Sequence, residues 1–173
     1  MNRTKKALRR ALLELMTERG YEVIGIQDIV DRADVGRSTF YAHYADKDDL
    51  LVENMAALGD YLRMKMADAQ EAVPHPALAF SLPMLEHMDE ARMMFRGLLG
   101  PKRSRVVHVF FNDILCELVR ERLGTQELPQ GVVVQFLVAG FMAVARWWII
   151  ESPKSSVAQV QEIYLRLVSQ TLV

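Results

Sequence analysis

Cysteine is almost absent from this chain, since Cys116 is the single one among 173 residues. One cysteine excludes an intramolecular disulfide framework and fits a reducing compartment. We also expect no signal peptide, because the first residues are charged and no apolar core follows them. We therefore expect a cytoplasmic protein in which Cys116 packs within an apolar helix.

An excess of charge of one sign is lacking too, because 21 basic and 22 acidic side chains leave a formal net charge of −1. This balance gives no global indication of a nucleic-acid partner. The sequence also contains no glycine-rich phosphate loop and no nucleophile–base pattern. An enzyme is therefore the least favoured class, and we expect no cofactor.

A metal-ligand motif is missing as well. His87 and His108 have Glu86, Asp89 and Asp113 near them in the sequence, but their spacing matches no known ligand pattern. We expect ordinary histidines at these positions and no metal site.

Hydrophobic residues make up 51% of the chain, which is enough for a substantial core. Their spacing is helical, and no alternating strand pattern or internal repeat is present, so an all-α fold is predicted. Pro74 and Pro76 mark the one proline-rich break. Helices are expected at 3–19, 26–33, from about 37, at 47–69, as two short helices within 77–99, and at 106–123, 131–150 and 157–172.

The stretch IQDIVDRADVGRSTFYAHYADKDDL (26–50) has the pattern of two short helices joined by a tight turn. Ile26, Ile29, Val30 and Ala33 give the first helix one apolar face. Asp tolerates the left-handed conformation of a sharp turn and Gly36 can act as an N-cap, so the residues 34–36 predict a turn and a second helix from about Arg37.

The second helix is predicted to present a short, uncharged outer face. Phe40 and Tyr44 share the inner face, which leaves Ser38 and Ala42 outward with Thr39 and Tyr41 on either side. Such a face suits the floor of a DNA major groove, where hydroxyls meet base edges and a methyl group meets thymine. Spacing alone fits a solvated helical hairpin equally well.

Five basic side chains fall within the first ten residues without an acidic one: Arg3, Lys5, Lys6, Arg9 and Arg10. A basic arm attracts phosphates over about 8 to 10 Å at ordinary salt. The alternative is a solvated helix face, but the position directly before the two short helices favours contact with a nucleic-acid backbone.

The run GYEVIGIQDIVDRADVGRSTFYAHYADKDDLL closely resembles the DNA-binding segment of TetR-family transcriptional regulators, over roughly residues 4 to 54. The resemblance implies a three-helix helix-turn-helix domain at 1–46 and a helical ligand-binding and dimerisation domain at 47–173. It also implies a homodimer that binds double-stranded DNA at a palindromic operator, as a repressor released by a small-molecule effector. The residues expected at the DNA are Lys5, Lys6, Gly25, Arg37, Ser38, Thr39, Tyr41, Ala42, His43 and Lys47, with Arg37, Tyr41 and Lys47 reaching phosphates.

Two departures from the family pattern affect helix starts. Gly25 stands where the family usually has a capping Thr, and Asp34, Val35 and Gly36 stand where it usually has Gly-Val-Ser. Both changes keep the motif but put the usual phosphate contacts at these two helix starts in doubt.

Residues 131–150 are apolar enough to be considered as a membrane span. Arg146 within the segment and its late place in the chain argue against this, and a soluble helix buried on two sides has the same composition. In the resemblance the last two helices form the dimer bundle, and Phe136, Gly140, Ala143 and Trp147 have a spacing suited to close helix contact. A membrane-associated helical protein remains the alternative, and we expect no membrane partner.

An effector pocket is the least defined prediction. The body is rich in methionine, whose flexible thioether suits an adaptable pocket, although core packing explains the same residues. The candidate ligand residues are Met84, His87, Met88, His108, Phe111, Met142 and Arg146. The sequence leaves open the operator, the effector and whether an effector exists.

Overall fold

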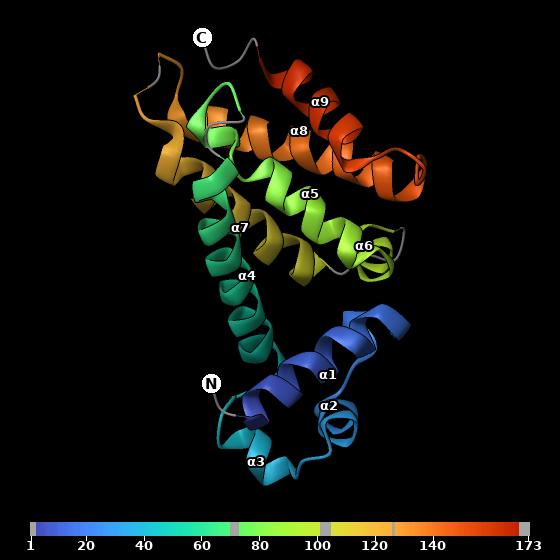
Figure 1. The fold of residues 1–173 in the computed structure, drawn as a ribbon. Coiled ribbons are helices and arrows are strands. Elements are labelled where there is room, and N and C mark those ends of the chain that lie inside the picture. The colour runs from blue at the N-terminus through green and yellow to red at the C-terminus, as the bar shows by residue number, and fades with distance from the viewer. Residues whose placement is uncertain (1–2, 70–72, 101–104, 126, 170–173) are drawn as a thin grey trace.

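The computed structural model describes residues 3–69, 73–100, 105–125 and 127–169, and within these ranges it is built from helices alone (Figure 1). This confirms the predicted all-α fold. The α-helices are α1 (Arg3–Arg19), α2 (Ile26–Ala33), α3 (Arg37–Tyr41), α4 (Lys47–Ala69), α5 (Ser81–Glu90), α6 (Arg92–Leu99), α7 (Arg105–Leu123), α8 (Gln130–Ile150) and α9 (Val157–Val168). Two short 3-10 turns, η1 (Tyr21–Val23) and η3 (Pro76–Leu78), lie between them.

The head consists of α1, α2 and α3. One apolar face of α1 is buried, with Leu8, Leu12, Leu15 and Met16 each at most 1% exposed. Gly20 ends the helix with a φ of 78°, a left-handed conformation that glycine adopts without strain. This face packs against α2 and α4 and holds the motif together.

The turn between α2 and α3 has the predicted conformation. Asp34 is left-handed, with φ 54° and ψ 51°. The Val35 N–H donates to the carbonyl of Val30 at 3.0 Å, and Gly36 is the N-cap of α3. The second helix therefore begins at Arg37, as the sequence predicts.

Helix α3 is too short to contain both Phe40 and Tyr44, which the sequence predicts to share its inner face. It ends at Tyr41, because the chain must turn before Asp46, whose carboxylate caps α4 by accepting the N–H of Asp49 at 2.9 Å. The N–H groups of His43 and Tyr44 still donate to the Phe40 carbonyl, both at 2.9 Å. Tyr44 consequently stays on the inner side, 3% exposed.

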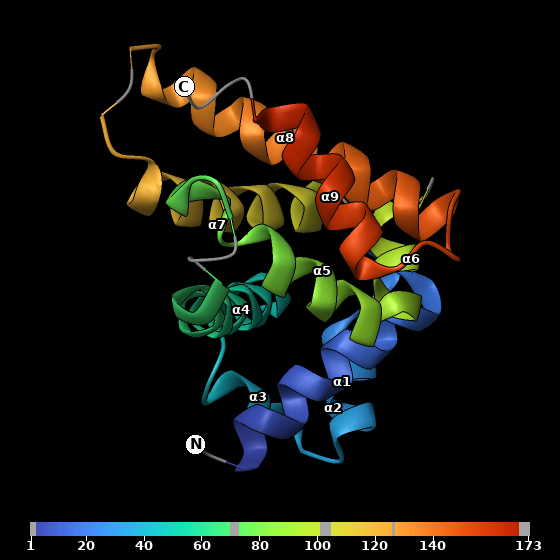
Figure 2. The same ribbon diagram turned by 45° about the horizontal axis from the view of Figure 1, so that its top comes forward.

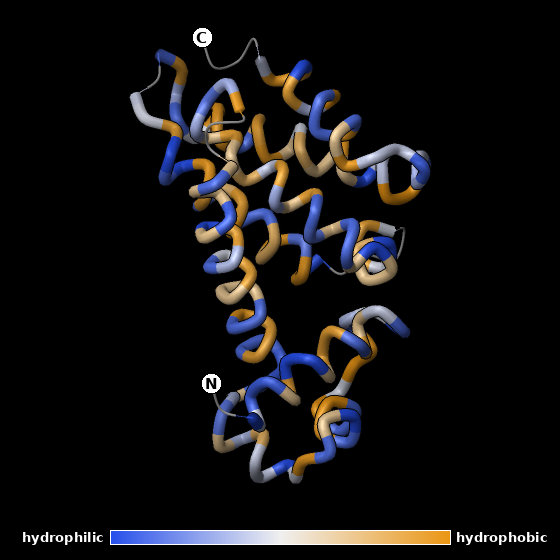
Figure 3. The backbone as a smooth tube through the Cα atoms, in the orientation of Figure 1, coloured by the Kyte–Doolittle hydropathy of each residue, from blue (hydrophilic) through white to orange (hydrophobic). Residues whose placement is uncertain are grey.

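Helix α4 connects the head to the body and runs most of the length between them (Figure 1). Hydrophobic and hydrophilic residues alternate along it (Figure 3), which is the pattern of a helix with one buried face. It ends at Ala69, as predicted.

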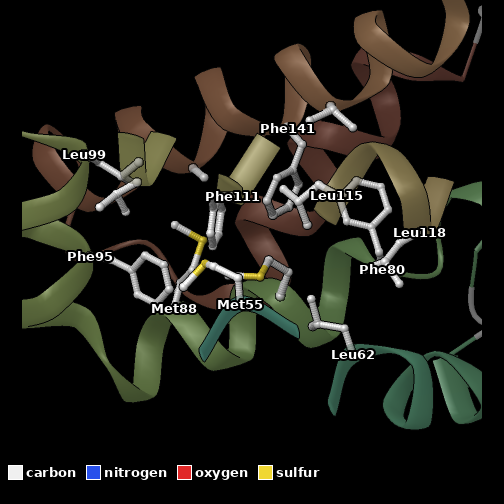
Figure 4. Close-up of a cluster of buried hydrophobic side chains, with 14 of the residues drawn as sticks. Met55, Leu62, Phe80, Met88, Phe95, Leu99, Phe111, Leu115, Leu118 and Phe141 are labelled. Carbon is white, nitrogen blue, oxygen red and sulfur yellow. The ribbon is translucent and has the colours of Figure 1, made fainter. Parts of the chain in front are cut away.

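The body is formed by α5 to α9 around one aromatic and aliphatic core (Figure 4). Phe80 and Phe141 meet edge to face with ring centroids 5.0 Å apart, and Tyr164 of α9 lies 5.4 Å from Phe141. Two views place α8 and α9 at the end of the molecule opposite α3 (Figures 1 and 2).

The apolarity of α8 follows from its position in the body. It packs against α6, α7 and α9. By length and composition it is the one helix of the described ranges that could cross a membrane, yet half of its most apolar window is buried inside this fold. Burial within the body therefore accounts for about half of this apolar window.

Gly140 faces α9 of the same chain, where a Cβ would lie at an ordinary contact distance of 4.0 Å from Tyr164 and Val168. On α9, Val160 is buried, whereas Ile163 and Leu167 are exposed. The predicted end of this helix, with Thr171 and Leu172, lies outside the described residues.

Candidate nucleic-acid interface and ligand cavities

The outer face of α3 is solvent-accessible and carries no acidic group. Arg37, Ser38, Tyr41 and Ala42 are exposed, and Thr39 is half-buried. Their side chains are a cation, two hydroxyl-bearing groups, a phenol and a methyl, which are the groups that contact base edges, phosphates and thymine methyls. His43 is half-buried just beyond the helix.

Phe40 anchors the helix that presents this face. Its ring is fully buried and lies 5.6 Å from the ring of Tyr41 and 5.7 Å from that of Tyr44. The Gly36 carbonyl accepts the N–H groups of Thr39 at 3.0 Å and Phe40 at 3.2 Å. A five-residue helix is too short to be stable alone, so these contacts fix its orientation.

Several cations of the head are paired internally. Arg32 of α2 donates to both carboxylate oxygens of Glu18 at 2.8 Å, and Arg19 lies 2.8 Å from Asp28. The Arg32 bond lowers the pKa of Glu18, and the Gly25 N–H, more than Arg19, lowers the pKa of Asp28. These pairs tie α1 to α2 and leave little of their charge for DNA.

Other cations remain available. Arg3, Lys6 and Arg37 form no ion pair with any part of the chain that the structure describes. Arg3 and Lys6 line an open cleft with Asp34 and Val35 of the turn, next to the start of α3. Two of the unpaired cations, Arg3 and Lys6, therefore lie beside the turn that precedes α3.

Lys47 has a different contact from the phosphate that the sequence predicts. Its ammonium donates to the carbonyls of Tyr21 at 3.1 Å, Glu22 at 3.5 Å and Ile24 at 2.9 Å, and lies 4.5 Å from the centre of the Tyr21 ring. The Tyr21 hydroxyl in turn donates to Asp48. Lys47 thus holds the start of α4 against the segment that follows α1.

Lys5 also differs from its predicted role. It forms an ion pair with Glu53 of α4 at 2.9 Å and lies over the ring of Tyr44, 5.2 Å from its centre. The bond from Lys5 lowers the pKa of Glu53. Both lysines join the head to α4, whereas Lys6 is exposed.

Gly25 is the N-cap of α2, and its backbone N–H donates to Asp28 at 2.8 Å. Without a hydroxyl, it offers no side-chain contact to a phosphate. The local capping is supplied instead by the Asp28 carboxylate.

Four of the candidate ligand residues meet at one cavity of about 170 Å³ in the body. This body cavity lies between α6, α7 and α8 and is lined by His108, Phe111, Met142 and Arg146 among mostly apolar neighbours. Arg146 donates to the Leu99 carbonyl at 2.8 Å, at the end of α6. The site therefore combines an apolar wall with one cation and one imidazole.

The remaining candidates are located elsewhere. Met84 and Met88 are fully buried and line neither this cavity nor its neighbour, so the core-packing alternative holds for both. His87 lies in a second cavity beside α1. No group of three or more metal-binding side chains occurs among the described residues.

The segment that contains the outer face of α3 matches the sequence profile of a known family. The sequence profile described as "Bacterial regulatory proteins, tetR family" matches residues 8–53. The uncharacterized HTH-type transcriptional regulator YxbF of Bacillus subtilis (strain 168) is 44% identical over 101 residues, which are 54% of this chain and 27% of that protein. The chain thus spans about a quarter of this curated relative.

Solved structures extend the similarity to the whole fold. A TetR transcriptional regulator from Streptococcus agalactiae 2603V is 28% identical with a TM-score of 0.71, over 95% of this chain and 93% of that one. FadR of Thermus thermophilus, described as a TetR-family transcriptional repressor in complex with lauroyl-CoA, is 22% identical with a TM-score of 0.61. That alignment covers 98% of this chain and 95% of FadR, and it supports the fold alone.

Proposed function

Because the chain belongs to the TetR family of bacterial regulatory proteins, we propose that it is a cytoplasmic homodimeric repressor that binds a palindromic operator. It is a transcriptional regulator and not an enzyme. DNA binding is general in the family. The operator-reading residues, the dimer surface and the effector described below are our assignments.

The outer face of α3 is the observation that carries this proposal. Ser38, Thr39 and Ala42 are short enough for the helix to approach base edges closely. Arg37 at the start of the helix and Lys6 on α1 supply charge for phosphates on either side. The buried ring of Phe40 fixes the position of α3, so the short polar side chains of Ser38 and Thr39 are held in place.

The dimer surface that we assign is the outer side of α8 and α9. Val132 and Leu167 are each 63% exposed and Phe136 is 52% exposed, although all three are large apolar side chains. Exposed large apolar side chains on two helices that pack together favour association. A two-fold contact on this side would let both copies of α3 face one duplex, as binding to successive major grooves requires.

The effector site that we assign is the body cavity. Its lining is mostly apolar, with Arg146 and His108 as its polar groups, which suits a small apolar molecule bearing one polar end. FadR, whose fold is similar, is described in complex with lauroyl-CoA, and we propose that this chain also takes a small-molecule effector.

Alanine substitutions on α3 test the central assignment. Thr39→Ala and Tyr41→Ala should each weaken binding to a selected operator by about 1 to 3 kcal/mol, measured by fluorescence anisotropy. Thr125→Ala removes the same hydroxyl from an exposed loop between α7 and α8 and should leave the affinity unchanged. If both α3 variants bind as tightly as the wild type, α3 does not read the DNA.

A further inference from the structure

A second cavity lies between the head and the body. It has a volume of about 370 Å³ and is lined by Leu13 and Met16 of α1, Met55 and Leu58 of α4, and Met94 and Leu98 of α6. We name it the joint cavity. Its walls come from both halves of the molecule, because α1 packs directly against α6 and α4 (Figure 2).

Two aromatic side chains separate the joint cavity from the body cavity. Phe95 and Phe111 line both spaces, and their rings meet edge to face with centroids 5.8 Å apart. Figure 4 shows Met55 and Met88 lying near the same pair of rings. The two cavities are therefore neighbours that share one wall, and a ligand in one contacts residues that the other does not.

The polar groups of the joint cavity favour an uncharged ligand. Burial lowers the pKa of His87 against the opposing effect of Glu90, so its imidazole is neutral at pH 7 and offers one acceptor and one donor. Arg9 donates to the Asn54 side chain at 3.1 Å, and Glu90 places an opposite charge in the same lining. Neither a cation nor an anion gains a clear net attraction there.

His87 is held between two aromatic rings, at 5.6 Å from Tyr61 and 5.7 Å from Phe95. This fixes the plane of the imidazole at the wall of the cavity. The remaining wall is thioether, aliphatic and aromatic carbon, which is adaptable enough to accept a flat apolar molecule.

We propose that the joint cavity binds an uncharged, mostly apolar small molecule of up to three rings whose single hydrogen-bonding group meets His87. The occupant touches α1 and α6 at once, so it stabilises this particular arrangement of head and body. On the basis of the proposed function, its binding and DNA binding change each other's affinity by the same factor.

Methionine methyl groups offer a direct test, with N-phenyl-1-naphthylamine as the probe because it is uncharged, has an aromatic body and carries one N–H. In protein labelled at the methionine methyl carbons, the probe should give intermolecular NOEs to Met16, Met55 and Met94. Met142 lines only the body cavity. NOEs to Met142 alone would overturn the proposal.

Two filled-cavity variants give a matched comparison by fluorescence titration of the same probe. Ala57→Phe occupies the joint cavity and should weaken the joint-site affinity tenfold or more, whereas Met142→Phe occupies the body cavity and should change it less than twofold. Wild-type affinity in a folded Ala57→Phe protein would contradict the assignment. If Ala57→Phe does not fold, the NOEs on the wild type decide.

Neither measurement contains DNA, so the failure of the joint site and the failure of the proposed function are distinguishable. Adding a selected operator duplex to the probe titration then tests the coupling alone. An unchanged probe affinity would show that the site does not affect the head.

Discussion

Lys47 holds the start of α4 against the segment that follows α1. Only the folded chain brings the carbonyls of Tyr21, Glu22 and Ile24 around its ammonium, because they approach from more than 20 residues away. Local spacing cannot predict such a contact. The ion pair of Lys5 with Glu53 is another example.

Lys47→Met should lower the free energy of unfolding by about 1 to 3 kcal/mol, because hydrogen bonds from a charged donor to the three carbonyls are lost. The slope of log K against log salt for DNA binding should stay the same. Lys6→Met is the matched control: it should leave stability unchanged and flatten that slope by about one unit. The opposite pattern would return Lys47 to the phosphate backbone.

His87 predicts a pH dependence of stability. Burial keeps the pKa of the folded imidazole below its ordinary 6.5, so the unfolded chain takes up a proton first as the pH falls. The contribution of the neutral imidazole to the free energy of unfolding is fully present above pH 6.5. It is lost as the pH falls through the lowered pKa of the folded state. The charged groups Arg9 and Glu90 and the phenol of Tyr61 line the same cavity as His87. The charge of Glu90 raises the pKa of His87 and so opposes the lowering by burial.

His87→Phe should therefore reduce the loss of melting temperature between pH 7.5 and pH 5, measured by calorimetry. The exposed His108 provides the control, and His108→Phe should retain the wild-type loss. The same loss in His87→Phe as in the wild type would contradict the attribution to His87. The lowered carboxylate pKa values of Glu18, Asp28 and Glu53 act at lower pH and do not interfere.

At the scale of elements, most helices were predictable because their starts and stops are local. Gly20 ends α1, Asp46 caps α4, and apolar spacing identifies the buried faces of α1 and α4. The length of α3 was not predictable, because its end depends on where the cap of α4 must lie. The exposed side of α9 was not predictable either, since an apolar stripe reads the same whether it faces the core or the solvent.

Glycine should have opposite effects on stability in the α2–α3 turn and within a helix. Asp34 has a φ of 54°, where a Cβ costs about 1 to 2 kcal/mol. Asp34→Gly should consequently be more stable than Asp34→Ala by about 1 kcal/mol in denaturant unfolding. At the exposed Ala56 within α4, Ala→Gly should instead lose about 1 kcal/mol. Equal stabilities for the two variants of Asp34 would contradict the left-handed turn.

The whole molecule separates two surfaces from two cavities. The first surface belongs to α3 at one end, and the second belongs to α8 and α9 at the other end (Figure 1). The two cavities are lined by residues of α1 and of α4 to α8. The sequence indicated the first surface and the helices of the second. It could not indicate the joint cavity, because that space is formed by segments that are distant in the chain, from Leu13 to Phe111.

Phe136→Glu should abolish the proposed dimer at micromolar concentration, because it places a charge in an apolar contact. The side chain is half exposed in the single chain, so the monomer should keep its helicity. Met64→Glu makes a comparable change at an exposed position of α4 and should leave the mass of the assembly as in the wild type. Analytical ultracentrifugation measures both, and a dimeric Phe136→Glu protein would place the interface elsewhere.

Two copies of α3 are expected to read one DNA site. Selection of bound sequences from random duplexes with the purified wild-type protein tests this expectation. We predict an enriched inverted repeat whose half-site centres lie about 10 base pairs, or a multiple of one helical turn, apart. A pool without an enriched sequence, or with a single half-site alone, would contradict the account.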